Sequence, residues 1–187
     1  VNYNIFALRS DYVHPLSKGR KLETGIKASR VVSDNDLNFT RLTEQGWQPI
    51  TNMSNHFIYT EHILAGYVNF NTKITEKVSL KAGLRGEQTY ADGYSVTLDS
   101  SNYRRYFNLF PSIFVQQKVS DFYSLNYNYS RRINRPYYEN LNPFIFYIDP
   151  FTFAGGNPHL NPAFIHNFEF TQTFQSKYNL TLGYSLT

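Results

Sequence analysis

Long stretches of this chain alternate apolar and polar residues with a period of two, which limits the possible folds more than any other feature. Residues 178–187 show it best, with Tyr and Leu at the even positions and Asn, Thr, Gly and Ser at the odd ones. Such a pattern predicts a β-strand with one apolar and one polar face. The same pattern, in places less regular, predicts seven more strands, over residues 1–13, 22–29, 57–70, 78–87, 106–117, 123–130 and 167–174.

The connections between these strands alternate strictly between short and long. The short ones are residues 14–20, 71–77, 118–121 and 175–177, and the long ones are 33–54, 91–104 and 131–162. Outer-membrane barrels have short periplasmic turns at one end and long external loops at the other. Most of the predicted strands also exceed the five or six residues usual in soluble proteins. We therefore predict an all-β fold, an antiparallel up-and-down transmembrane β-barrel.

Composition supports a membrane barrel over a soluble domain. The chain of 187 residues has 16 Tyr and 16 Phe, but its Asp, Glu, Lys and Arg together make up only 17%. Amphipathic tyrosine rings suit the interface between lipid and water. Cysteine is absent, which excludes disulfides and thiolate metal sites. The net charge of +4 comes from scattered Lys and Arg residues, so we expect no nucleic-acid partner.

The order of short and long connections also sets the direction of the strands. If the short turns are periplasmic, the first strand descends from the external side and the eighth climbs toward it. A complete barrel with an even number of strands has both termini at the periplasmic side. We therefore expect residues 1–187 to be one partial barrel domain, eight adjacent strands of a larger barrel, without a plug domain.

The long connection 131–162 holds five of the eight prolines and several Asn-Pro or Asp-Pro turns, so we expect no regular helix or strand in it. Its many aromatic residues argue against disorder. We predict an ordered external loop that folds back over the barrel mouth, with residues 144–153 packed on the wall or on neighbouring loops. The candidate residues of this loop are Pro136, Asn142, Pro143, Phe144, Gly156, Asn157 and Pro158.

Two groups of charged residues are candidate sites. Arg85 and Glu87 lie two residues apart on one strand face, where they are predicted to line the lumen, either as a simple solvated pair or as a contact to a plug. Five arginines are expected near the external end of one hairpin, where they form either a solvated rim or a patch for lipopolysaccharide phosphates or an anionic substrate. These are Arg104, Arg105, Arg131, Arg132 and Arg135.

Several short motifs, in this order, resemble the barrel domain of TonB-dependent outer-membrane receptors of Gram-negative bacteria. They are residues 83–89 (GLRGEQT), 109–112 (LFPS), 127–137 (YNYSRRINRPY), 141–144 (LNPF) and 156–162 (GNPHLNP). The resemblance implies a barrel of about 22 strands with a plugged lumen. It also implies TonB and a plug domain as partners, outer-membrane lipid and lipopolysaccharide as surroundings, and import of a small molecule, glycan or peptide. It implies no cofactor, no metal and no catalysis.

Two other functions stay open from the sequence. One is a small self-contained outer-membrane barrel that serves as an adhesin or a structural anchor. The other is a soluble, aromatic-rich β-sandwich that binds glycans, because alternation alone does not distinguish a lipid-facing side from a soluble core.

Overall fold

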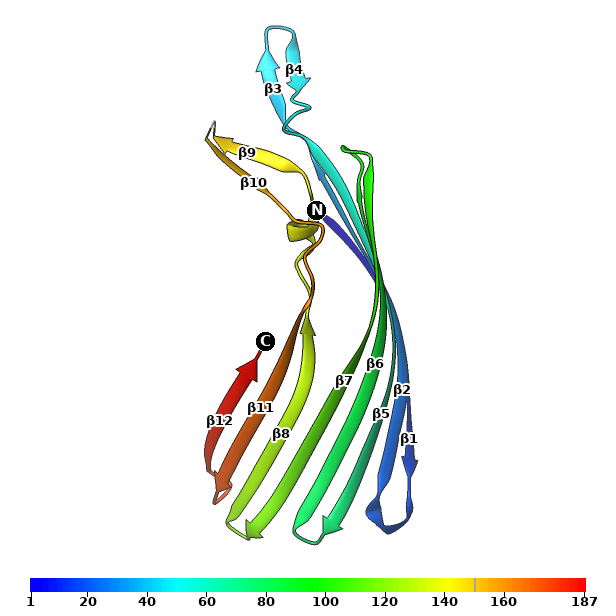
Figure 1. The fold of residues 1–187 in the computed structure, drawn as a ribbon, viewed down its shortest axis with the longest axis vertical. Helices are drawn as coiled ribbons and strands as arrows, with labels where there is room; N and C mark the ends of the chain where they lie inside the picture. Colours follow the sequence, from blue (N-terminus) through cyan, green and yellow to red (C-terminus); the bar gives the residue numbers. More distant parts are fainter. Residues whose placement is uncertain (150) are drawn as a thin grey trace.

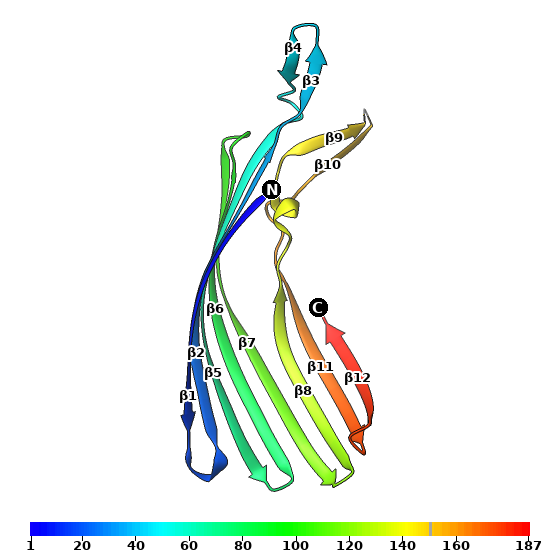
Figure 2. The ribbon, with the colours of Figure 1, turned by 180° about the vertical axis from the view of Figure 1, so that it is seen from behind.

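The computed structural model describes residues 1–149 and 151–187, and for residues 146–148 it describes only the backbone. Its main feature is one antiparallel sheet of eight strands, in which each strand pairs with the sheet strands before and after it along the chain. Figure 1 and Figure 2 show this sheet as a long curved wall. In spatial order the strands are β1 (Asn2–Pro15), β2 (Lys21–Leu37), β5 (Asn55–Thr75), β6 (Val78–Ser95), β7 (Ser100–Ser120), β8 (Tyr123–Asn134), β11 (Ala163–Phe174) and β12 (Tyr178–Leu186).

The short connections lie together at one end of the wall and the longer segments at the other, as the sequence predicts (Figure 1). The β1–β2 connection contains a short 3₁₀ turn, η1 (Ser17–Gly19). Strands β1 and β12 form the two edges of the sheet, and in the described part of the chain they do not pair with each other. This single open sheet fits neither a soluble sandwich, which needs a second packed sheet, nor a closed barrel of eight strands.

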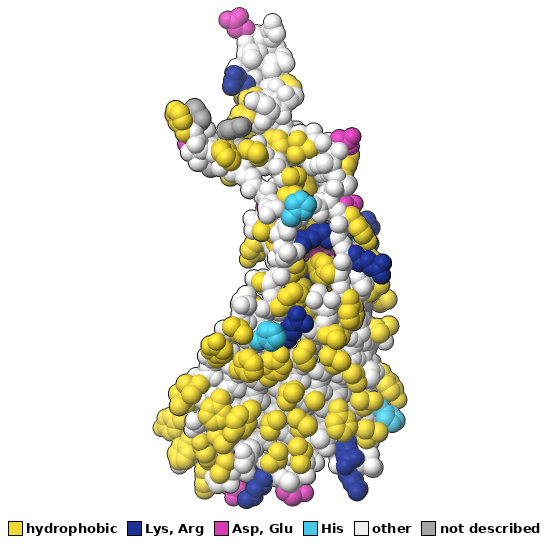
Figure 3. Space-filling view, in the orientation of Figure 1, with side chains coloured by type: hydrophobic (Ala, Val, Ile, Leu, Met, Phe, Trp, Pro, Cys, Tyr) yellow, Lys and Arg dark blue, Asp and Glu magenta, His cyan; other side chains and the backbone are white. Residues whose placement is uncertain are grey.

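The register separates the side chains into two faces. On β5, Glu61 and Ala65 are buried, whereas the alternate residues His62 and Leu64 are exposed. The buried set faces inward, and the exposed set faces outward and is mainly apolar. On the face seen in Figure 3, apolar side chains gather over the half of the sheet nearer the short turns. Charged side chains lie at the end of the sheet formed by these turns. An outward apolar band with a polar interior is the arrangement of a membrane barrel.

Two predicted long connections are largely strand, which corrects the sequence prediction. Strand β6 continues to Ser95 and β7 begins at Ser100, so only residues 96–99 form a turn. Small inward residues, such as Ala91 and Gly93, let the pairing continue beyond the expected end. In the β2–β5 connection the chain adds a hairpin of β3 (Thr40–Thr43) and β4 (Gly46–Pro49).

The expectation that residues 131–162 contain no regular structure is also wrong. Strand β8 extends to Asn134, and a 3₁₀ turn follows. Pro143 and Pro158 flank the short strands that come next and do not interrupt them. The loop thus contains η2 (Tyr138–Leu141), β9 (Ile145–Asp149) and β10 (Thr152–Gly155).

The backbone of the β9–β10 hairpin projects away from the wall (Figure 1, Figure 2). Phe151 is 95% exposed and Phe153 is 63% exposed. The predicted packing of Phe146, Tyr147 and Ile148 lies outside the described side chains. One part of the loop that packs on the wall is η2. No helix among the described residues is long and apolar enough to cross a membrane.

Candidate functional site

The inward face of the external half of the sheet holds a cluster of buried charges. Glu61 on β5 and Glu87 on β6 are 4% and 9% exposed. Arg135, the first residue after β8, donates a hydrogen bond from Nη2 to Glu87 Oε2 at 2.8 Å, and its Nε lies 3.5 Å from Glu61 Oε1. The same Nη2 contacts Thr89 Oγ1 at 3.2 Å. A guanidinium from the long loop therefore bridges two carboxylates of the wall.

Arg85 completes this cluster from the other side. Its Nε donates to Glu87 Oε1 at 2.6 Å, so each oxygen of Glu87 accepts a hydrogen bond from a different arginine. The cluster contains two carboxylates and two guanidiniums and is therefore balanced in charge. Buried charges are costly unless they are paired; here Glu87 is both paired and hydrogen-bonded, whereas Glu61 is held by the ion pair with Arg135. The cluster consequently holds the base of the long loop against the sheet.

An apolar contact next to the charges fixes the loop further. Leu141 of η2 is 4% exposed and belongs to a buried cluster with Phe57, Tyr59 and Ala91 on the inward face. The ring of Tyr138 stacks on Tyr59, with centroids 4.6 Å apart. Burial raises the pKa of the Tyr138 phenol above its ordinary value, and the negative charge of a nearby carboxylate acts in the same direction. Tyr138 therefore stays neutral at physiological pH and suits this packed position.

The two sides of the loop meet at Gly156. Its N–H donates to the carbonyl oxygen of Asn142 at 2.9 Å, and Asn157 N–H donates to the carbonyl oxygen of Asn140 at 2.8 Å. A Cβ added to Gly156 would lie 2.5 Å from both carbonyl oxygens. Because these are backbone atoms, they cannot move aside as a flexible side chain would. Only glycine fits at this crossing.

Replacing Gly156 by Ala is expected to release η2 from the wall and to destabilise the loop by about 2 kcal/mol, through the steric conflict with the backbone. Limited proteolysis of the segment 136–162 in the folded barrel measures this release. Gly155→Ala is the matched control, because a Cβ there would meet its nearest atom, Ile145 Cγ1, only at 3.3 Å. Equal protease resistance of the two variants would contradict the assignment.

The returning side of the loop is attached to β7. Arg104 donates to the carbonyl oxygen of Leu160 and, from Nη2, to Asn161 Oδ1 at 2.5 Å. Asn102 Nδ2 lies 3.3 Å from Nδ1 of His159. Both flanks of the loop thus contact the inward face, one on β5 and β6 and the other on β7.

The five arginines predicted as one patch lie in separate places. Arg104 and Arg105 are neighbours on one strand, so their side chains point to opposite faces, and Arg105 lies over the outward ring of Tyr90 at 5.3 Å. Arg135 belongs to the buried cluster.

Arg131 is the residue directly after Ser130, where the pairing of β7 with β8 ends. Its Nη1 donates to the carbonyl oxygen of Leu109 at 2.7 Å, and its guanidinium lies 4.3 Å from the centre of the Phe164 ring. Arg132 is exposed on the inward face. It lines an inward hollow of about 460 Å³ together with Arg9, Lys81, Arg85, Arg131 and the acidic Glu23. Three of these basic residues already pair with carboxylates, Arg9 with Asp11, Lys81 with Glu23 and Arg85 with Glu87.

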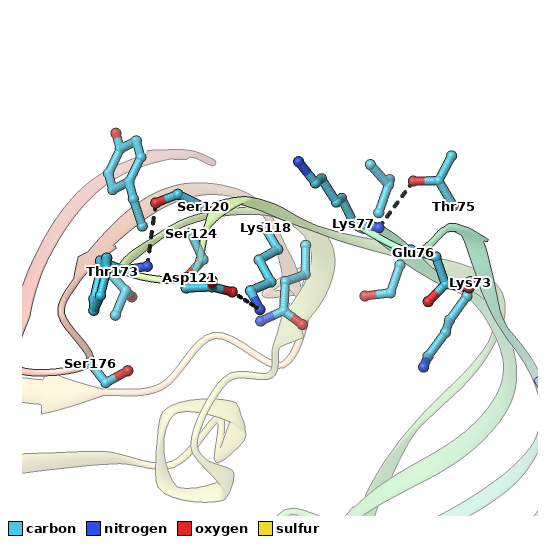
Figure 4. Close-up of a pocket in the computed structure, with 15 residues that line it drawn as sticks. Lys73, Thr75, Glu76, Lys77, Lys118, Ser120, Asp121, Ser124, Thr173 and Ser176 are labelled. Carbon is cyan, nitrogen blue, oxygen red and sulfur yellow. Dashed lines mark hydrogen bonds and ion pairs between the residues drawn. The ribbon is translucent and has the colours of Figure 1, made fainter.

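A second hollow, of about 320 Å³, lies between the short turns at the opposite end of the sheet (Figure 4). Its polar groups mostly pair with one another. Lys118 Nζ lies 2.7 Å from Asp121 Oδ1, which lowers the pKa of that carboxyl. The backbone N–H groups of Lys77 and Phe122 donate to Thr75 and Ser120 hydroxyls at 3.2 and 3.3 Å. These contacts stabilise the turns.

The sequence places Arg85 and Glu87 together, but it assigns Arg135 to the external arginine patch and does not single out Glu61. The signal was available, because Glu61 is a single acidic residue within the otherwise weakly charged stretch 57–70. The described residues contain no group of three or more His, Asp or Glu side chains placed to hold a metal ion.

A curved antiparallel wall with an apolar outward face and a polar inward face defines a transmembrane β-barrel protein. Residues 1–187 match the Outer membrane protein beta-barrel family, and the chain belongs to this family. Its location is the bacterial outer membrane. No curated protein matches the sequence.

One solved structure with a similar backbone is that of the ferric citrate transporter FecA in its unliganded form. The two chains have 10% sequence identity and a TM-score of 0.68, so the likeness concerns the fold. The alignment covers 97% of this chain and 26% of the FecA chain. The chain thus spans about a quarter of that protein and provides part of a barrel wall.

Proposed function

We propose that this chain forms wall and external loops of a TonB-dependent receptor that imports a scarce or large substrate across the outer membrane. The observation that carries the proposal is the open eight-stranded sheet. Nearly the whole of this chain aligns with about a quarter of a transporter chain. The motifs at residues 83–89, 127–137 and 156–162 support the same assignment. The family and the transporter likeness support a transport or structural role.

In the proposed mechanism the substrate binds at the external loops, TonB displaces a plug, and the substrate passes along the inward face. The residues 136–162 form a rim over the mouth, held by Arg104 and Arg135 on its two sides. Arg85 lines the inward hollow and is the proposed contact to the plug. The buried Glu87 positions Arg85 for this contact.

Uptake by cells tests the proposal. Spent medium is compared, by mass spectrometry, between cells with and without the complete protein, each in the presence and absence of TonB. We expect at least one solute to disappear from the medium only when both proteins are present. Disappearance that does not depend on TonB would contradict the proposed mechanism, and so would unchanged medium in all four cultures.

The exposed guanidinium of Arg132 in the inward hollow further predicts that the substrate carries negative charge. Arg132→Gln is expected to reduce uptake severalfold, because removing one exposed charge changes binding by about 1 kcal/mol. Arg131→Gln is the matched variant, and it is expected to lower the stability of the barrel, since Arg131 packs on Phe164. Uptake assays at matched surface abundance measure both. Unchanged uptake by Arg132→Gln would exclude a role of the hollow in binding.

A further inference from the structure

The outward face carries a row of polar and aromatic side chains just beyond the apolar band. The cross-strand register aligns one residue from each of five neighbouring strands, because each of these residues is the direct partner of the next. The row consists of Phe6, Arg30, His62, Tyr90 and Arg105. Neither arginine lies within ion-pair distance of a carboxylate among the residues that the structure describes. Their charges are free to meet an external anion.

The height of this row fits the external edge of the bilayer. On β5 the outward positions from Thr72 to His62 span ten residue steps. With a rise of about 3.3 Å per residue and a tilt near 40°, this distance is about 25 Å along the barrel axis, the usual height of the apolar band. Because the long connections lie beyond His62, the row belongs to the external leaflet.

A groove begins directly beneath the row. Arg30 and His62 border a hollow of about 410 Å³ whose other walls include Leu8, Ala28 and Leu64. These three apolar residues also line an adjoining, mostly apolar hollow of about 540 Å³. Small residues form the floor there, and a Cβ added at Gly66 would find no atom closer than 4.0 Å. The two hollows have the size of typical ligand sites.

Other residues complete the groove. Gln88, which points outward within the apolar band, satisfies its amide by donating to the backbone carbonyl oxygens of Tyr106 and Thr89 at 3.1 and 3.2 Å. Phe107 leans over Gly86, so that a Cβ at Gly86 would lie 3.2 Å from its ring, and forms the opposite wall. The groove is therefore mainly apolar along its length, and Arg30 and His62 lie at its external end.

We propose that this groove is a binding site for one phosphorylated lipid of the external leaflet, with an acyl chain over Gly66 and a phosphate held by Arg30 and His62. Arg105, placed on the Tyr90 ring, extends the cationic edge of the site. Guanidinium groups bind phosphate through paired hydrogen bonds. The site is independent of the import function, since it lies on the outward face of the wall.

Binding of diphosphorylated lipid A to the complete protein in detergent, measured by native mass spectrometry, tests the site. We expect Arg30→Gln combined with Arg105→Gln to weaken binding about tenfold or more, since each basic residue near a lipid surface contributes about 1 kcal/mol. Gly66→Leu fills the groove without a steric conflict and is expected to weaken binding severalfold. The matched controls are Arg20→Gln combined with Arg41→Gln for charge, and Gly183→Leu for groove filling, since Gly183 is also uncrowded.

Binding within twofold of the unmodified protein in both test variants would overturn the proposal. If lipid A without its phosphates bound as tightly as the diphosphorylated form, the proposed phosphate contact would be wrong. If inorganic phosphate displaced bound lipid A as effectively as unlabelled lipid A does, the site would bind free anions and not lipid. If the double arginine variant lost binding but Gly66→Leu did not, the proposal that an acyl chain lies in the groove would be wrong.

Discussion

Replacing Arg135 by Ala is expected to destabilise the barrel by about 3–5 kcal/mol, one of the two largest effects of a single substitution in this chain. The change leaves Glu61 and Glu87 buried without their shared cation, and an uncompensated buried charge costs about this much. It also removes the guanidinium that joins the long loop to the wall. Urea unfolding of the barrel in lipid vesicles measures the change in free energy of unfolding.

Two further variants separate charge from shape at this position. Arg135→Lys keeps the charge but cannot bridge both carboxylates, so we expect an intermediate loss. Arg135→Ala combined with Glu61→Gln and Glu87→Gln removes the charges together and is expected to recover part of the stability. A loss below about 1 kcal/mol for Arg135→Ala would show that the cluster is hydrated and does not hold the loop.

Placing a charge in the lipid-facing band should have the other large effect. Ile113 lies on the outward face of β7, 46% exposed in the isolated chain and paired with Ala82 and Tyr129. Ile113→Arg is expected to destabilise the folded barrel in vesicles by about 2 kcal/mol, because a charge within the lipid-facing band is costly. Unfolding in urea with native-like lipid present measures it.

Asn128→Arg provides the matched control. Asn128 pairs with Phe114, the residue next to Ile113, so it lies at nearly the same depth but on the inward face. It already donates from Nδ2 to Glu169 Oε2 at 3.1 Å, and an arginine there would have a carboxylate partner. We expect a change below about 1 kcal/mol. Equal losses from both substitutions would mean that the two faces are not lipid and lumen.

The strands and their order could be predicted because alternation is a local property of the sequence. Residues 178–187 reveal their two faces without any tertiary information. The external ends could not be predicted in the same way, since inward residues there, such as Ala91 and Gly93, are small or apolar and interrupt the alternation. Strand β6 therefore appears to end early when only its sequence is considered.

The candidate site could be predicted only in part, for a related reason. Arg85 and Glu87 stand two residues apart on one strand, so their proximity follows from strand geometry. The contact of Arg135 with Glu61 joins residues 74 positions apart and depends on where the loop returns. The separation of Arg104 from Arg105 follows from strand alternation, but only once the strand is known to extend that far.

A membrane-spanning wall requires lipid on its outward face, and the absence of cysteine in this chain allows a direct measurement of this contact. Single cysteines at residues 124–130 of β8, each carrying a fluorophore, are placed in the folded barrel in vesicles. We predict that a quencher attached to lipid acts at residues 125, 127 and 129, and that an aqueous quencher acts at 124, 126, 128 and 130. Quenching that shows no period of two along this strand would contradict a membrane-spanning wall.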